Sequence, residues 1–136
     1  MFSTTVEYAI RALVRLAQSP SDKTVLGRQL AAETQVPANY LSKLLLTLRK
    51  AGLIEATRGA GGGYRLRKDP AEVRLAEVIH LFDPRPRSVC LLSGGRECSP
   101  ENPCSAHDRW RKVQEAYADF TENTTLADIS VRSSGR

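Results

Sequence analysis

Apolar residues recur at helical spacing in the N-terminal part of the chain and predict three helices. The first is expected from about Thr5 to Gln18, because its apolar positions are separated by four, three and four residues. The second is short and ends near Thr34. The third begins at Pro37, which suits a first helical turn, and ends at Gly52, which can supply a left-handed cap. The apolar positions are Val6, Ile10, Leu13 and Ala17; Leu26, Leu30 and Ala31; and Tyr40, Leu41, Leu44, Leu45 and Leu48.

Two short strands and a fourth helix are predicted next. Residues 53–57 and 64–66 have the pattern of strands, and the glycine-rich run 58–63 between them predicts a hairpin turn. A fourth helix is expected within 73–82, and the proline-rich run 83–87 then marks a boundary. The apolar face of this helix carries Leu75, Val78, Ile79 and Phe82.

Closer to the C-terminus, apolar residues recur at steps of four, three, four and three, which is a heptad seam on a long helix. Such a narrow seam buries itself against another helix, so we predict homodimerisation. The alternative is that this helix packs back onto the first helix of its own domain. A capped turn is expected at 124–129, followed by a frayed tail. The seam consists of Ala106, Trp110, Val113, Tyr117 and Phe120.

The second and third helices, joined by a tight turn, have a helix-turn-helix layout, and the hairpin that follows makes it a winged helix. Polar residues on the outer face of the third helix can reach base edges in a major groove. Arg58, in the wing turn, can enter a narrow minor groove. The alternatives are a helical hairpin with a polar outside, and a nucleotide-phosphate loop, but the glycine run lacks the Gly-Lys-Ser/Thr ending of such loops. The candidate DNA contacts are Asn39, Tyr40, Ser42, Lys43, Arg49, Arg58, Gly61 and Arg65, with Thr47 as a substitute for Arg49.

Charge supports a nucleic-acid partner. The chain has a net charge of +5, and the segment from Lys43 to Lys68 contains seven cations and one anion. Basic density of this kind is typical of proteins that bind a phosphate backbone, although it also occurs on solvated faces. The 136 residues, 41% of them apolar, suffice for one modest domain with an appendage. We find neither a signal peptide nor a membrane span, and expect a cytoplasmic protein without a membrane partner.

The three cysteines of the chain lie within fifteen residues, as Cys90-x7-Cys98-x5-Cys104, and His107 follows closely. A reducing compartment keeps such cysteines as thiols, and a loop rich in Gly, Ser and Pro can bring them to one iron–sulfur cluster or zinc ion. A thiol-based enzyme is not expected, because there is no Cys-x-x-Cys pair and no second acid–base group beside His107.

Taken together, several motifs resemble the IscR/NsrR/CymR family of bacterial winged-helix regulators. The resemblance covers about residues 1–130. It implies a homodimer in which the two long C-terminal helices cross, and which binds a pseudo-palindromic operator in double-stranded DNA. Several members hold an iron–sulfur cluster that changes their affinity for DNA. The motifs are Glu7-Tyr8-Ala9 with Arg11-Ala12-Leu13, Tyr40-Leu41 through Leu48–Leu53, the wing 58–64, and the cysteine loop before Thr125-Leu126-Ala127-Asp128.

The resemblance also implies a ligand set for a 2Fe–2S or 4Fe–4S cluster. Cys90, Cys98 and Cys104 would be ligands, and the fourth would be His107, as in the IscR branch, or Glu7, which matches the carboxylate of the NsrR branch. The seven-residue gap after Cys90 is longer than the five-residue gap of the IscR pattern. We favour His107 because it adjoins Cys104. The structural alternatives are that His107 caps its helix and that Glu7 pairs with Arg11 one turn on.

The expected fold is mainly α with a small β-hairpin wing. It comprises a winged helix-turn-helix domain over 1–83, a cysteine-rich loop over 84–105, a dimerisation helix over 106–123, and a short turn and tail over 124–136. The expected function is a homodimeric transcription regulator, a repressor or an activator, whose operator affinity a cluster controls by sensing iron–sulfur status, nitric oxide or redox state. A zinc-binding or thiol-based regulator without a cluster is the alternative.

Overall fold

The computed structural model describes residues 2–84 and 105–130. In these ranges the chain forms α-helices and one β-hairpin, and the predicted helices of the N-terminal part appear within two residues of their expected ends. In chain order the elements are α1 (Thr4–Ala17), α2 (Gly27–Thr34), α3 (Ala38–Lys50), β1 (Ile54–Thr57), β2 (Gly63–Leu66), the 3-10 turn η1 (Pro70–Glu72), α4 (Leu75–Phe82), α5 (His107–Asn123) and α6 (Leu126–Ser130).

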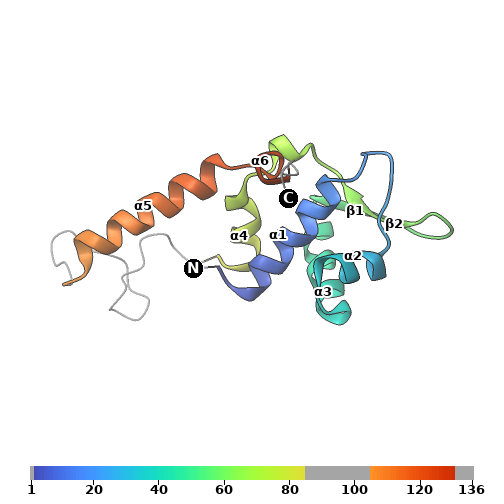
Figure 1. The fold of residues 1–136 in the computed structure, drawn as a ribbon, viewed down its shortest axis with the longest axis horizontal. Coiled ribbons are helices and arrows are strands. Elements are labelled where there is room, and N and C mark those ends of the chain that lie inside the picture. Colours follow the sequence, from blue (N-terminus) through green and yellow to red (C-terminus); the bar gives the residue numbers. More distant parts are fainter. Residues whose placement is uncertain (1, 85–104, 131–136) are drawn as a thin grey trace, which may run out of the picture.

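Helix α1 lies at the centre of the fold, where α2, α3, α4, α6 and β2 all pack against it (Figure 1). Its start is set by Ser3, whose Oγ accepts a hydrogen bond from the backbone N–H of Val6 at 3.2 Å. Glu7 in the first turn and Arg15 in the last turn carry the charges that the helix dipole favours. The buried face of α1 consists of Val6, Ala9, Ala12, Leu13 and Leu16.

The turn between α2 and α3 has the tight geometry of a helix-turn-helix. Gln35 ends α2 in the left-handed conformation, with φ of 59°, and buried Val36 then holds the turn against the core. Pro37 is the N-cap residue of α3, so the helix starts one residue later than the sequence predicts. Leu26 is likewise the N-cap residue of α2 and is exposed, although the sequence pattern places it on the apolar face.

The hairpin is antiparallel and runs from the pair Ile54–Leu66 to the pair Thr57–Gly63. The loop between α1 and α2 pairs with β2 through a single antiparallel bridge, in which Val25 and Tyr64 exchange backbone hydrogen bonds in both directions at 2.8 Å. The free edge of β2 is therefore covered at Tyr64, close to the hairpin turn.

The end of the described chain returns to the core. The N–H of Thr125 donates to Asp128 Oδ2 at 2.9 Å, and the N–H of Asp128 donates to Thr125 Oγ1 at 3.3 Å, which confirms the predicted capped turn. Leu126 is fully buried, and its N–H donates to the carbonyl of Val73 at 2.9 Å. Helix α6 thus anchors the C-terminal end of α5 beside α1.

Helix α5 extends away from the helical body on the side opposite to the hairpin (Figure 1). It contacts α4, and the ring of Tyr117 lies 5.4 Å from that of Phe2, so part of the seam touches its own chain. Val113 and Phe120 are nevertheless 44% and 47% exposed.

Within 2–84 and 105–130 no helix is long and apolar enough to cross a membrane. The division of the chain into a DNA-binding domain, a cysteine-rich loop, a dimerisation helix and a terminal turn with a tail stays a prediction from the sequence.

Candidate nucleic-acid interface and metal ligands

Helix α3 buries its apolar face and leaves its polar candidates in solvent. Leu41, Leu44, Leu45 and Leu48 are buried in the core. Four of the candidate DNA contacts, Asn39, Ser42, Lys43 and Arg49, are exposed, whereas Thr47 is half-buried. This exposed face carries donors and cations of the type that contact base edges and phosphates.

Tyr40 joins α3 to α1. Its ring packs edge-on against Tyr8, with centroids 5.4 Å apart and an interplanar angle of 87°, and its hydroxyl is hydrogen-bonded to that of Thr5. The guanidinium of Arg11 lies 5.5 Å from the centroid of the Tyr8 ring. Because Tyr40 is also 38% exposed, it is both a packing residue and an accessible one.

The cations of the hairpin differ in their partners. Arg65 forms an ion pair with Glu55, its register partner on the facing strand. Arg58 follows β1 directly, is exposed, and makes no ion pair with any residue that the structure describes. Gly61, with φ of 76°, lies in the same turn in a conformation that favours glycine.

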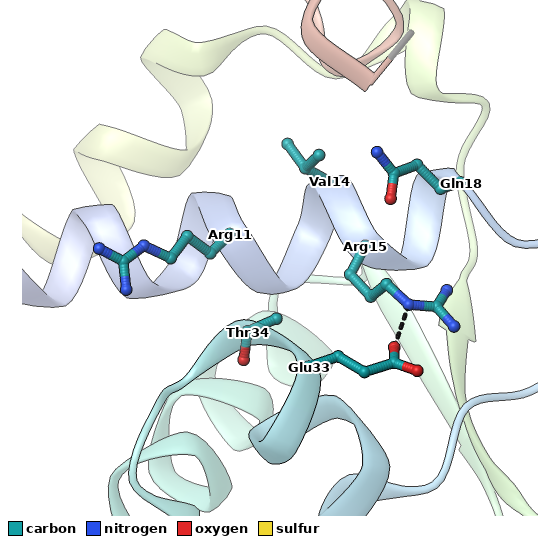
Figure 2. Close-up of a pocket in the computed structure, with 6 residues that line it drawn as sticks. All are labelled: Arg11, Val14, Arg15, Gln18, Glu33 and Thr34. Atoms are coloured by element: carbon teal, nitrogen blue, oxygen red, sulfur yellow. Dashed lines mark hydrogen bonds and ion pairs between the residues drawn. The ribbon is translucent and has the colours of Figure 1, made fainter. Parts of the chain in front are cut away.

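A shallow pocket lies between α1 and α2, lined by Arg11, Val14, Arg15, Gln18, Glu33 and Thr34 (Figure 2). Figure 2 shows Arg15 pointing from α1 to Glu33 on α2, with which it forms an ion pair. Arg15 Nη1 also donates to Ser19 Oγ at 2.6 Å. We attribute this group to the docking of α2 on α1, which fixes the position of the helix-turn-helix.

The proposed metal ligands are divided between described and undescribed parts of the chain. Cys90, Cys98 and Cys104 lie outside the described residues. His107 is the first residue of α5 and only 8% exposed, and Ala106, not His107, is the N-cap residue. Glu7 is exposed on α1, and no ion pair joins it to Arg11. In the described ranges, no three His, Cys, Asp or Glu residues come together as a metal site.

Sequence reasoning missed two features of this surface. Thr24 and Val25 contact the hairpin, but only the β-branched pair before Leu26 hints at a strand there. Leu46 is 48% exposed beside Lys43 on α3, and its place outside the apolar period was the available signal.

Comparison with known proteins assigns the chain to a protein family. The sequence profile of the family described as Rrf2, iron-dependent transcriptional regulator, matches residues 2–132. The chain belongs to the Rrf2 family. A similar Rrf2-type relative is the HTH-type transcriptional regulator IscR of Yersinia pseudotuberculosis, 32% identical over 122 residues, which cover 90% of this chain and 74% of that protein.

Solved structures confirm the winged-helix fold of this Rrf2 protein. CymR of B. subtilis, described as the global cysteine regulator, has a TM-score of 0.80 and 25% identity, with 96% of this chain and 95% of that one covered. IscR of T. potens has a TM-score of 0.72 and 28% identity, covering 95% and 85%. CymR of Staphylococcus aureus in an oxidized form has a TM-score of 0.77 and 27% identity, covering 98% of both chains. This Rrf2 protein is therefore a transcriptional regulator of the IscR and CymR type, as its motifs predicted.

Proposed function

We propose that this Rrf2 protein is a homodimer that binds a pseudo-palindromic operator in double-stranded DNA and regulates transcription from it. The observation that carries this proposal is the exposed polar face of α3, held by buried leucines and followed by a hairpin with the exposed cation Arg58. In such a complex α3 lies in the major groove and the wing contacts an adjacent groove or backbone. Asn39, Tyr40, Ser42, Lys43, Arg49, Arg58, Gly61 and Arg65 are the proposed contacts.

Dimerisation would use the seam of α5. Val113 and Phe120 expose large apolar side chains on a helix that leaves the body of the protein, and exposed seams of this spacing are covered by a second helix in coiled coils. Trp110 and Tyr117 belong to the same seam. Two crossed α5 helices would set the distance between the two recognition helices, which must match half-sites about 34 Å apart.

We further propose that an iron–sulfur cluster controls the affinity for DNA. The donor set fits by its chemistry, since three thiolates with an imidazole or a carboxylate can ligate iron. The family description, iron-dependent, and the similarity to IscR support it. Cys90, Cys98 and Cys104 would hold the cluster with His107 or Glu7. When bound, the cluster supplies a redox-active iron centre that is open to attack where its ligand is not a thiolate.

The chain's own residues offer two ways to link that site to DNA. His107 begins α5, so a ligand at this position is attached directly to the proposed dimer helix. Glu7 lies in the first turn of α1, next to Tyr8, whose ring packs on Tyr40 of α3. A shift of α5 or α1 would change the spacing or orientation of the recognition helices and hence the operator affinity.

A regulator without a cluster is the second candidate. The similarity to CymR, including a structure in an oxidized form, favours control by thiol oxidation. Three cysteines and a histidine also satisfy tetrahedral zinc.

Anaerobic purification, with an absorbance spectrum and counts of iron, sulfide and zinc, separates these possibilities. The proposal predicts a coloured protein with iron and sulfide in comparable amounts. A colourless protein with stoichiometric zinc would contradict the cluster and favour the zinc site. A protein with neither metal and with reversibly oxidised thiols would contradict the cluster and favour control by thiol oxidation.

A further inference from the structure

The loop between α1 and α2 makes contacts with the wing that the sequence does not suggest. Val25 and Tyr64 exchange two backbone hydrogen bonds of 2.8 Å, which place the loop along the free edge of β2. The fit is close, because a Cβ on Gly63 would lie 2.5 Å from the carbonyl oxygen of Val25. The half of β2 nearer the turn is therefore fixed between β1 and this loop.

A side chain extends these contacts to the wing turn itself. The hydroxyl of Thr24 donates to the carbonyl oxygen of Gly61 at 2.8 Å, beyond the last backbone pair. Within the turn, the N–H of Gly62 donates to the carbonyl of Gly59 at 2.9 Å. A Cβ on Gly62 would lie 3.1 Å from the carbonyl carbon of Arg58, so the backbone of Arg58 packs against the residue next to Gly61.

From these contacts we infer that Thr24 is a positioning residue for DNA binding: its hydroxyl holds the wing turn at a fixed angle to the body and so presents Arg58 to the DNA. This inference rests on the proposed function. Thr24 acts through Gly61 and Arg58 without touching DNA. A wing that is not held must be ordered when DNA binds, and that loss of conformational entropy lowers the affinity.

The test compares Thr24→Val, which removes the donor but keeps the shape and β-branching, with Thr24→Ser, which keeps a hydroxyl. Each is measured with a duplex selected from random sequence by the wild-type protein. Loss of one neutral hydrogen bond should weaken binding by about three- to tenfold in Thr24→Val. Thr24→Ser should bind nearly as the wild type does. Unfolding temperatures should fall by no more than a few degrees in Thr24→Val, because only one neutral hydrogen bond of the folded state is lost.

A double-mutant cycle with Arg58→Ala distinguishes positioning from a direct or general effect. If Thr24 acts by presenting Arg58, Thr24→Val should not weaken DNA binding further in a protein that already carries Arg58→Ala. Amide order parameters of Gly59 and Gly61 should also fall in Thr24→Val, which reports the mobility of the turn without DNA.

The outcomes separate this inference from the proposed function. A wild-type protein that selects no duplex would overturn both. Binding to a duplex without any contribution from Arg58 would overturn this inference and leave operator binding through α3 in place. A wild-type protein that binds through Arg58 would overturn this inference alone if Thr24→Val bound as tightly. Equal weakening by Thr24→Val with and without Arg58, or weakening by Thr24→Ser, would overturn it in the same way.

Discussion

The two arginines of the hairpin have different partners, and this decides how each can contribute to DNA binding. Arg65 is paired with Glu55 across the strands, and this partly exposed pair, worth up to about 1 kcal/mol, must rearrange before Arg65 neutralises a phosphate. Arg58 is exposed in the wing turn and has no ionic partner among the described residues. We therefore expect Arg58 to contribute more than Arg65 to the affinity for DNA.

Replacement of Arg58 by Ala should weaken binding to the selected duplex by about tenfold, which corresponds to roughly 1.4 kcal/mol. Arg65→Ala should have a smaller effect. Arg109→Ala is the matched control, because it removes the same charge from an exposed position on α5. Titration by fluorescence anisotropy at fixed salt gives the three affinities. An equal loss in Arg109→Ala would show that net charge, not the wing, is responsible.

The ligand set is also tested residue by residue. Cys98→Ala and Cys104→Ala should each remove the colour of the anaerobic protein together with its iron and sulfide. His107→Ala should lower the iron content and shift the absorbance bands, whereas Glu7→Ala should leave both unchanged. The reverse result for His107 and Glu7 would identify Glu7 as the fourth ligand. A full cluster in both cysteine variants would contradict the assignment of Cys98 and Cys104 as ligands.

At the scale of elements, the helix-turn-helix contains one strained residue. Gln35 adopts a left-handed backbone conformation to end α2, and a side chain with a Cβ disfavours that conformation by about 1 kcal/mol or more. The position is exposed, so the side chain gains little packing in return. Glycine is the usual residue at such a site.

Gln35→Gly should therefore stabilise the protein by about 0.5–1 kcal/mol, with an increase in unfolding temperature of about 2–4 °C. Gln35→Ala is the control, since it shortens the side chain but keeps the Cβ. Thermal unfolding followed by circular dichroism provides the measurement. An equal increase in both variants would mean that the side chain, not the backbone conformation, causes the effect.

Helix α5 is the element on which the proposed dimerisation depends. Phe120→Glu places a charge in the exposed seam and should convert the dimer into a monomer, because a buried unpaired carboxylate costs several kcal/mol in an apolar interface. Arg111→Glu, nine residues earlier and so on the opposite side of the helix, is the control and should stay dimeric. Light scattering after gel filtration measures the mass. A wild-type monomer, or a dimeric Phe120→Glu variant, would contradict the proposed interface.

Local patterns predicted most of these elements, and long-range contacts account for what they missed. The apolar period of α1 and α3, the glycine-rich turn, and the Thr125–Asp128 cap are local signals, and the structure confirms them. Val25 pairs with the hairpin only because Tyr64, far along the chain, lies on the free edge of β2. The Tyr8–Tyr40 contact likewise depends on the packing of two helices. The cysteine ligands remain a prediction from the sequence and the family resemblance.

At the scale of the whole molecule, the wing and the proposed dimer helix lie at opposite ends of the protein, with α1 between them (Figure 1). Helix α6 fixes the C-terminal end of α5 to the core, and Phe2 contacts Tyr117 of the seam. A change at the start of α5 or α1 would therefore reach the helix-turn-helix through packed contacts. This arrangement suits a regulator in which sensing and DNA binding are separate but mechanically linked.

The most direct test is the affinity of the anaerobically purified protein for its selected duplex, measured over a range of salt concentrations before and after removal of the cluster. The account predicts an affinity that falls steeply with salt, because several phosphates are neutralised, and that changes at least severalfold when the cluster is removed. No salt-sensitive affinity for DNA in either form would contradict the account. Equal affinities of the two forms would contradict control by a cluster.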